Sequence, residues 1–410
     1  MNMADPTREA AFALLTAVCE RRRTLEDALN ALPPMEPRDR AAAHRLAAAV
    51  LRRTGTLDAV LEPLMRKAPP DPVRHVLRIG AAGLLLLDMP PHAAVGTAVA
   101  LARSSGLVPF AGLVNAVLRK VATLGTAVLD TLDSPRLDTP SWLWASWGTN
   151  ARAIAEAHQQ EAPLDLTPGI DHAPAEGGLR LPTGSVRYPA GTHVAAVTGF
   201  AEGRLWVQDA AAALPVLLLA PRPDERIADL CAAPGGKTAQ LAAAGARVTA
   251  VDHDPARLAR LAENLKRWRL PADLVQADVS SWVPPELFDA VLLDAPCSAT
   301  GTIRRHPDVP HLKRPRDIAM LCDTQDKLLA AAARMLRPGG RMIYAVCSLQ
   351  SEESAPRLAA SGLRHDPFLT EELPGLPEAM TAEGYLRTHP GMWRERGGMD
   401  GFFAARLIRD

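Results

Sequence analysis

The chain has 410 residues, of which 48% are hydrophobic and 22% are charged, which is ordinary for a globular protein of two or three domains. Its charges sum to zero, and no apolar run approaches the roughly 18 residues of a membrane span, so we expect neither a membrane protein nor a secreted one. The five scattered cysteines lack C-x-x-C spacing, which argues against a zinc site or a disulfide framework. We therefore expect a monomeric, metal-free protein of a reducing cytoplasm.

The charges are unevenly distributed along the chain. Residues 1–120 hold 16 Lys and Arg against 11 Asp and Glu. An excess of cations of this size fits contact with the phosphates of a nucleic acid, and it fits a solvated helical surface equally well.

The first segment, 1–125, is predicted to be an all-helical bundle. Apolar residues such as Leu57, Leu61 and Leu64 recur at helical spacing, and Pro33-Pro34 and Pro90-Pro91 mark breaks between helices. Three stretches of this segment resemble the helical domain of NusB-type antitermination factors, namely 8–18, 91–95 and 113–119. Because that family binds RNA, the resemblance implies an RNA-binding module.

The second segment, 126–200, is predicted to be a linker and a small α+β subdomain. Residues 140–157 have the pattern of a helix that carries Trp142, Trp144 and Trp147. Residues 163–199 are rich in Pro and Gly and contain short apolar pieces, which indicates small strands and loops.

The third segment, 201–410, alternates apolar runs with helical stretches, a pattern typical of a doubly wound, mostly parallel α/β sheet. Ligands of such sheets bind at the carboxyl ends of the strands. The predicted strands are 226–230, 247–251, 273–277, 290–293, 341–346 and 402–407. The predicted helices lie near 237–245, 255–268, 317–336 and 351–360.

The stretch Asp229–Thr238 joins the first of these strands to a helix through a glycine turn, as nucleotide-type sites do. Its Gly-Gly-Lys-Thr end suggests a phosphate-binding P-loop, but that motif requires glycine where this chain has Cys231. A P-loop NTPase is therefore weakened and stays open as an alternative.

Acidic residues follow the next strands along the chain. Asp252 ends the second strand, about 20 residues beyond the glycine turn, where doubly wound folds hold a ribose hydroxyl. Asp278 and Asp294 follow the third and fourth strands, and the G-x-G-x-x-G motif of dehydrogenases is absent. We interpret the ligand as S-adenosylmethionine, with Asp252 on the ribose, Asp278 on the adenine amino edge and the turn beside the methionine part.

Two cysteines, Cys297 and Cys347, end the fourth and fifth strands. Carbon 5 of cytosine is a poor nucleophile, and a thiolate that adds to C6 makes C5 reactive toward a methyl donor. Cysteine suits this step because its thiolate is strongly nucleophilic and partly formed at neutral pH. One cysteine would attack, and the other would assist elimination near C5.

The third segment resembles the RNA 5-methylcytosine methyltransferases of the RsmB/Sun/Fmu family, which have a Rossmann-like class I methyltransferase core. The matching segments are Asp229–Thr238, Val251–Asp252, Ala277–Asp278, Leu293–Gly301, Arg304–Asp308, Tyr344–Ser348 and Asp400–Phe403. The resemblance implies that Cys347 is the nucleophile, that Cys297 serves product release, and that small-subunit (16S) ribosomal RNA is the substrate. The cofactor-binding residues that it implies are Cys231, Ala232, Ala233, Pro234, Gly235, Gly236, Lys237, Asp252, Asp278 and Asp294.

Arg304, Arg305 and His306 follow the first cysteine loop, where a flipped base and its phosphates would pass. We expect them to contact RNA. A different class of function, an RNA-binding ribosome assembly factor with a vestigial methyltransferase core, stays open, although both cysteines and all three acidic residues are present.

Overall fold

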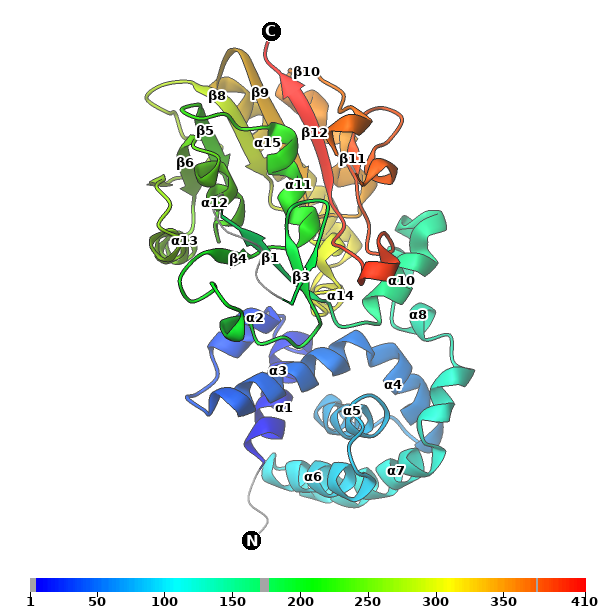
Figure 1. The fold of residues 1–410 in the computed structure, drawn as a ribbon. Helices are drawn as coiled ribbons and strands as arrows, with labels where there is room; N and C mark the ends of the chain where they lie inside the picture. The colour runs from blue at the N-terminus through cyan, green and yellow to red at the C-terminus, as the bar shows by residue number, and fades with distance from the viewer. Residues whose placement is uncertain (1–4, 170–176, 374) are drawn as a thin grey trace. The chain divides into compact units, whose positions relative to one another are not determined.

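The computed structural model describes residues 5–169, 177–373 and 375–410, and the chain divides into two compact units (Figure 1). The first unit comprises the chain up to Gln159 together with Arg305–Lys313, and the second comprises Gln160–Arg304 and Arg314–Asp410. The segment 126–200 that we expected to stand between two domains gives its helices to the first unit and its strands to the second. The part of it at 170–176 lies outside the described residues.

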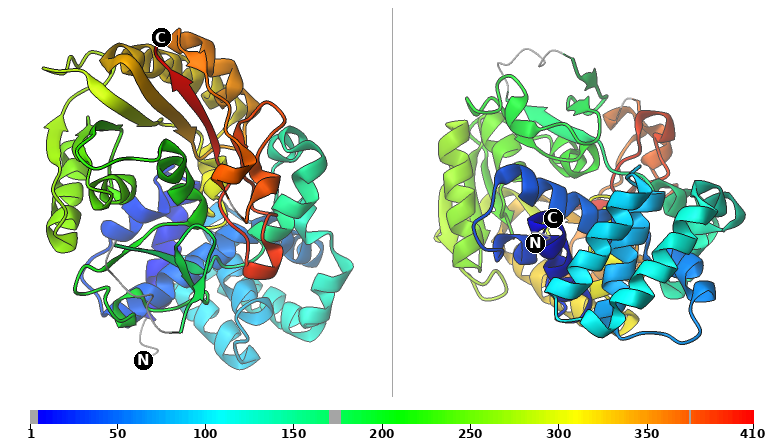
Figure 2. Two further views of the ribbon diagram at one scale, coloured as in Figure 1. Left: turned by 45° about the horizontal axis from the view of Figure 1, so that its top comes forward. Right: turned by 90° about the horizontal axis from the view of Figure 1, so that it is seen from below.

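The first unit is helical, as the apolar spacing predicted (Figure 2, right). Its helices begin at local signals: the Asp5 side chain accepts a hydrogen bond from Arg8 N at the start of α1, and the Thr24 hydroxyl accepts one from Asp27 N at the start of α2. Leu14, Leu57 and other side chains from several helices are fully buried in one core. The helices are α1 (Pro6–Cys19), α2 (Leu25–Asn30), α3 (Pro37–Arg52), α4 (Thr54–Leu61), α5 (Asp71–Leu85), α6 (Pro91–Ser104), α7 (Ala111–Leu124), α8 (Ser134–Leu137), α9 (Ser141–Ser146), α10 (Ala151–His158) and α14 (Val309–Leu312).

Two features of this unit differ from the sequence-based expectation. The single helix expected over 140–157 is divided into α9 and α10 by a 3₁₀ turn, Gly148–Asn150. The helix α14 comes from the third segment of the chain, and residues beside it are bonded into the helical unit. The Asp308 carboxylate accepts a hydrogen bond from Leu25 N (2.9 Å), and the His311 ring contacts the Leu51 carbonyl (3.0 Å).

The second unit contains a small antiparallel sheet, with strand order β2-β3-β1-β4. Leu166, Val186 and Leu205 on these strands pack into a small core of their own. The strands are β1 (Leu164–Pro168), β2 (Leu179–Arg180), β3 (Val186–Tyr188) and β4 (Leu205–Val207).

The main sheet of the second unit has the order β10-β12-β9-β8-β5-β6-β7, with β11 paired to β12 (Figures 1 and 2). The five strands from β9 to β7 run parallel and β12 runs antiparallel to β9, so the predicted doubly wound, mostly parallel sheet is confirmed. The strands are β5 (Arg226–Leu230), β6 (Arg247–Asp252), β7 (Asp273–Gln276), β8 (Phe288–Asp294), β9 (Leu336–Val346), β10 (Arg364–His365), β11 (Leu386–Arg387) and β12 (Phe403–Ile408).

Helices cover both faces of this sheet, which explains why the central strands are apolar throughout. Ile227 and its neighbours on one face pack with α11 (Ala210–Leu219) and α12 (Gly236–Ala243). Ala228 and its neighbours on the other face pack with α15 (Pro315–Met335). Helix α13 (Pro255–Trp268) lies beyond α12, in a cluster with Trp206. The arrangement leaves the strand ends as the edge where polar side chains gather.

The stretch 351–360, which we predicted to be an α-helix, forms two 3₁₀ helices instead, η7 (Ser351–Glu353) and η8 (Ala355–Ser361). The backbone of Ser354 between them is not helical (φ −109°, ψ −130°), which ends the first turn and directs Glu353 into the protein. Within the three described ranges, no helix combines the length and the apolar character that a bilayer crossing requires.

Candidate active site

The glycine turn after β5 is tightly folded against α13. Cys231 and Gly235 both have positive φ, 60° and 105°, and a Cβ atom on Gly235 would lie 2.1 Å from the Leu261 side chain. Glycine is favoured at position 235 because other residues rarely adopt this φ, and a larger residue would also displace the Leu261 side chain. The turn is also tied to the next strand, because Ala233 N donates a hydrogen bond to the Asp252 carboxylate (3.1 Å).

The two acidic residues expected to hold a nucleoside lie at neighbouring strand ends. Asp252 ends β6, is 1% exposed, and also accepts a hydrogen bond from Asp254 N (3.1 Å). Asp278 follows β7 by two residues and is exposed. Hydrogen bonds from the Ser280 hydroxyl and backbone hold the pKa of Asp278 below its ordinary value, so this carboxylate is ionised and open to a hydrogen-bond donor.

Lys237 and Asp294 form an ion pair beside the turn. Lys237 Nζ lies 2.6 Å from Asp294 Oδ2 and 5.3 Å from the centroid of the Phe402 ring. Burial alone would lower the pKa of Lys237, but the neighbouring Asp294 carboxylate outweighs it and the pKa is raised. The ammonium charge is therefore already balanced by a carboxylate, unlike the lysine of a phosphate-binding loop.

Asp229, which opens the glycine motif, has a buried carboxylate to which we had assigned no role. Its Oδ2 accepts a hydrogen bond from the Thr238 hydroxyl (2.5 Å), and among the described residues its Oδ1 has no hydrogen-bond partner. Burial raises the pKa of Asp229 to about 7, although the bond from Thr238 opposes the shift. A buried oxygen without a partner at this edge provides an acceptor for a cationic ligand.

The two cysteines that end β8 and β9 are brought into contact. These strands are parallel neighbours, with Asp294 opposite Ala345, and the loops that follow place Cys297 Sγ 3.4 Å from Cys347 Sγ. Two effects raise the pKa of Cys297 well above its ordinary value: the contact with Cys347, which is the larger effect, and burial. The two thiols share one hydrogen bond, in which either sulfur can be the donor, and the raised pKa of Cys297 favours the form in which Cys297 carries the proton.

The backbone around Cys347 is held by two glycines. Gly301 N donates to the Cys347 carbonyl (3.0 Å), and Gly401 N donates to the Gly301 carbonyl (2.8 Å). A Cβ atom on Gly301 would lie 1.9 Å from the Gly401 carbonyl oxygen. The loops after β8, after β9 and before β12 thus meet at one point, which joins three of the motifs separated in the sequence.

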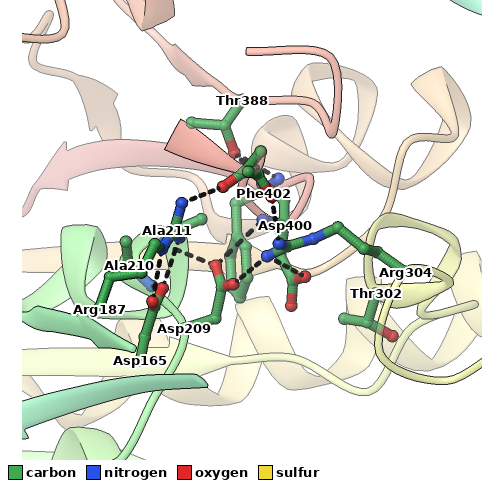
Figure 3. Close-up of polar contacts among 12 residues, drawn as sticks. Asp165, Arg187, Asp209, Ala210, Ala211, Thr302, Arg304, Thr388, Asp400 and Phe402 are labelled. Carbon is green, nitrogen blue, oxygen red and sulfur yellow. Dashed lines mark hydrogen bonds and ion pairs between the residues drawn. The ribbon is translucent and has the colours of Figure 1, made fainter. Parts of the chain in front are cut away.

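Arg304 does not lie on the surface as we expected, and we no longer propose it as a phosphate ligand. Its side chain is 1% exposed, and its guanidinium lies 2.6 Å from Asp209 and 3.6 Å from Asp400 (Figure 3). It also donates to the Gly397 carbonyl (2.8 Å). A guanidinium enclosed by two buried carboxylates has a structural role.

A second buried ion pair lies beside Arg304 in the same close-up (Figure 3). The Arg187 guanidinium donates to both oxygens of Asp165, each at 2.6 Å. Asp165 also accepts from Ala210 N (3.0 Å), so the small sheet is bonded to the start of α11. The two pairs join distant parts of the second unit.

Arg305 and His306 lie in the stretch Arg305–Lys313, which belongs to the first unit. Arg305 is half-buried and His306 is exposed. Contact of these two residues with RNA stays a prediction.

The other three cysteines, Cys19, Cys231 and Cys322, are buried or half-buried and are not part of the Cys297–Cys347 pair. Cys322 is buried on α15 and its thiol donates to the Glu352 carbonyl (3.4 Å). Burial raises the pKa of Cys19 to about 11 and that of Cys231 to about 12, so neither is a thiolate at neutral pH. Within the described part of the chain, no group of three or more His, Cys, Asp or Glu side chains is arranged to hold a metal ion.

Two family models match this chain, one over its helical N-terminal part and one over its α/β C-terminal part. The family model described as 16S rRNA methyltransferase RsmB/F matches residues 216–408, and that of the NusB family matches residues 5–123. The chain is 36% identical over 408 residues to the ribosomal RNA small subunit methyltransferase B of Sodalis glossinidius, which covers 92% of this chain and 91% of that protein. It is 35% identical to the protein of the same name from Salmonella typhi, over the whole of both chains.

Two solved structures share the fold. The crystal structure of PH0851 aligns with a TM-score of 0.75 at 22% identity and covers 98% of both chains. The structure of a methyltransferase homolog protein from Pyrococcus horikoshii aligns with a TM-score of 0.54 at 24% identity and covers 65% of this chain and 93% of that one.

Proposed function

The chain belongs to the RsmB/F family of 16S rRNA methyltransferases, and from this premise we propose that it methylates carbon 5 of a cytosine in small-subunit ribosomal RNA. The observation that carries the proposal is the pair of thiols, Cys297 and Cys347, whose sulfurs lie 3.4 Å apart at the ends of adjacent parallel strands. Methylation at a ring nitrogen or at a ribose hydroxyl needs no thiol nucleophile, whereas C5 of cytosine does.

S-adenosylmethionine is the methyl donor, and when bound it supplies an electrophilic methyl group on a sulfonium. The residues at the strand ends fit it. The buried Asp252 suits the ribose hydroxyls, the exposed and ionised Asp278 suits the adenine amino group, and the turn 231–237 suits the methionine part. The unpartnered Asp229 Oδ1 provides an acceptor for the ammonium group of the methionine.

The reaction that we propose begins with the Cys347 thiolate, which forms a bond to C6 of the cytosine and makes C5 nucleophilic. C5 then accepts the methyl group, and the sulfonium sulfur keeps the electron pair of the broken bond. A base removes the C5 proton, the C5–C6 double bond re-forms, and the Cys347 thiolate leaves. Cys297 lies beside Cys347 and assists this elimination and the release of product. The target base leaves its stack so that both reagents reach the ring.

Replacement of each cysteine tests the mechanism. We expect Cys347→Ala to abolish methyl transfer, because no other group adds to C6. We expect Cys297→Ala to accumulate a covalent RNA–protein adduct, seen as a band of reduced mobility that survives denaturation, because elimination is blocked. Cys19→Ala, which removes a thiol on α1 of the helical unit, is the matched control and should turn over normally. Normal turnover by Cys347→Ala would contradict the proposal.

The target nucleotide is identified by bisulfite sequencing of ribosomal RNA from cells with and without the gene. We expect the loss of one 5-methylcytosine from the small-subunit RNA. Loss of no such base would contradict the proposed substrate, and the same outcome with no adduct in vitro would favour an assembly factor that binds RNA without chemistry.

A further inference from the structure

Glu353 is a fully buried carboxylate to which the proposed reaction gives no role. It lies on η7, six residues after Cys347, and turns toward both cysteine loops. Its Oε1 accepts a hydrogen bond from Ser298 N (2.9 Å), and its Oε2 accepts bonds from the hydroxyls of Ser298 and Ser348. These two serines directly follow Cys297 and Cys347 in the chain.

The two serine hydroxyls also lie side by side and are enclosed. Their hydroxyl oxygens lie 3.0 Å apart, and both side chains are fully buried. Gln325 on α15 donates one hydrogen bond to Glu353 Oε1 (3.0 Å) and one to the Pro296 carbonyl (3.0 Å). One carboxylate therefore receives donors from the loop after β8, from the loop after β9 and from a rigid helix.

Arg387 on β11 holds the second loop from the opposite side. Its guanidinium donates to the carbonyls of Ser348 (3.1 Å) and Leu349 (2.6 Å). Burial lowers the pKa of Arg387 to about 10, and the charge of Glu353 opposes the shift. The hydrogen bonds that converge on Glu353 offset the cost of burying its carboxyl group, since a buried polar group without partners would be costly.

We propose that Glu353 is a positioning residue that holds the two cysteine loops in register, so that the thiols of Cys297 and Cys347 meet the same base. Only a carboxylate offers acceptors to four donors at once, because the amide of glutamine has one oxygen and a serine hydroxyl has one. The effect of Glu353 on the rate of methyl transfer rests on the proposed function, whereas its effect on the closeness of the two thiols does not.

The geometric consequence is measured without RNA or methyl donor. In buffers of reduced and oxidised glutathione, the equilibrium between the Cys297–Cys347 disulfide and the dithiol gives the effective concentration of one thiol at the other. Peptide mapping identifies that pair among the five cysteines. We expect Glu353→Ala to lower the effective concentration about tenfold, which corresponds to about 1.4 kcal/mol, since it removes the hydrogen bonds that hold both loops. Glu352→Ala, which removes the exposed neighbouring carboxylate, is the control and should leave it unchanged.

The catalytic consequence is measured in the methyl-transfer assay. Glu353→Ala should lower kcat at least tenfold while the Kd for S-adenosylmethionine, set by the turn after β5, stays within about twofold of the wild type. Glu353→Gln keeps one oxygen and the side-chain volume, so it should fold and recover part of kcat. An effective concentration that is unchanged in the glutamine or the alanine variant would overturn the inference. A wild-type protein that transfers no methyl group would instead overturn the proposed function and leave the glutathione result standing.

Discussion

Replacement of Arg304 by methionine distinguishes a structural guanidinium from an RNA ligand. Methionine keeps much of the apolar stem and removes the charge. Asp209 and Asp400, which are 5% and 0% exposed, would then lose the cation that lies 2.6 Å and 3.6 Å from them. The Gly397 carbonyl would lose its donor as well.

The magnitude follows from the burial of these groups. Removal of one partner from a buried ion pair costs about 3–5 kcal/mol, because the remaining charge is left without compensation. Arg187 stays nearby and its pKa is raised in part by both Asp209 and Asp400, so it offsets some of the loss. We therefore expect about 3 kcal/mol, the lower end of that range, which is a factor of roughly 100 in the unfolding equilibrium.

Amide hydrogen exchange is the suitable assay because it reports on the second unit by itself. The protected amides of β9 and β12 should exchange about 100-fold faster in Arg304→Met. Arg316→Met, at a side chain that is 76% exposed, is the control and should leave exchange unchanged. Unchanged exchange in Arg304→Met, combined with weaker RNA binding, would refute this reasoning and restore the phosphate contact.

Two further predictions concern Asp229 and Gly301. Because burial raises the pKa of Asp229 from 3.8 to about 7, the folded protein without ligand should lose stability as pH rises between these values, by about 4 kcal/mol from this group. Asp229→Asn should flatten the dependence in urea unfolding, and an unaltered slope would contradict the assigned burial. Gly301→Ala would place a Cβ atom 1.9 Å from the Gly401 carbonyl oxygen, so it should reduce methyl transfer at least tenfold while cofactor binding is kept. Gly96→Ala on α6, where a Cβ meets nothing within 4 Å, should leave both unchanged.

The strands of the main sheet were predictable because each is a short apolar run between polar turns. All six predicted strands are present, and five of them begin and end within two residues of the predicted bounds, for example β5 at Arg226–Leu230. The short β10 and β11 were missed, since two residues make no periodic pattern. Helix α11 was missed as well, although Asp209 caps it through a hydrogen bond to Ala211 N. Its apolar residues surround the helix on all sides and show no amphipathic spacing.

The residues of the candidate site that could be predicted are those that follow the carboxyl end of a strand. Asp252, Asp294 and Cys347 each come directly after a predicted strand, Cys297 follows four positions after one, and parallel strands place their carboxyl ends at one edge. Glu353 was not predictable, because its role depends on turning inward from a 3₁₀ helix that the sequence presented as an ordinary α-helix. Arg304 was assigned to the surface because charged residues usually lie there.

By itself, the sequence determined the helical first segment and the parallel sheet, and it indicated two candidate cysteines after adjacent strands, because apolar periodicity and motifs are local properties of the chain. The tertiary structure alone decided that the cysteine sulfurs lie 3.4 Å apart, that Arg304 is enclosed by Asp209 and Asp400, and that Arg305–Lys313 joins the helical unit. Each of these depends on residues far apart in the chain, for example 283 positions for the bond between Leu25 and Asp308. Burial and pairing are properties of the neighbours that folding brings together, so no local pattern encodes them.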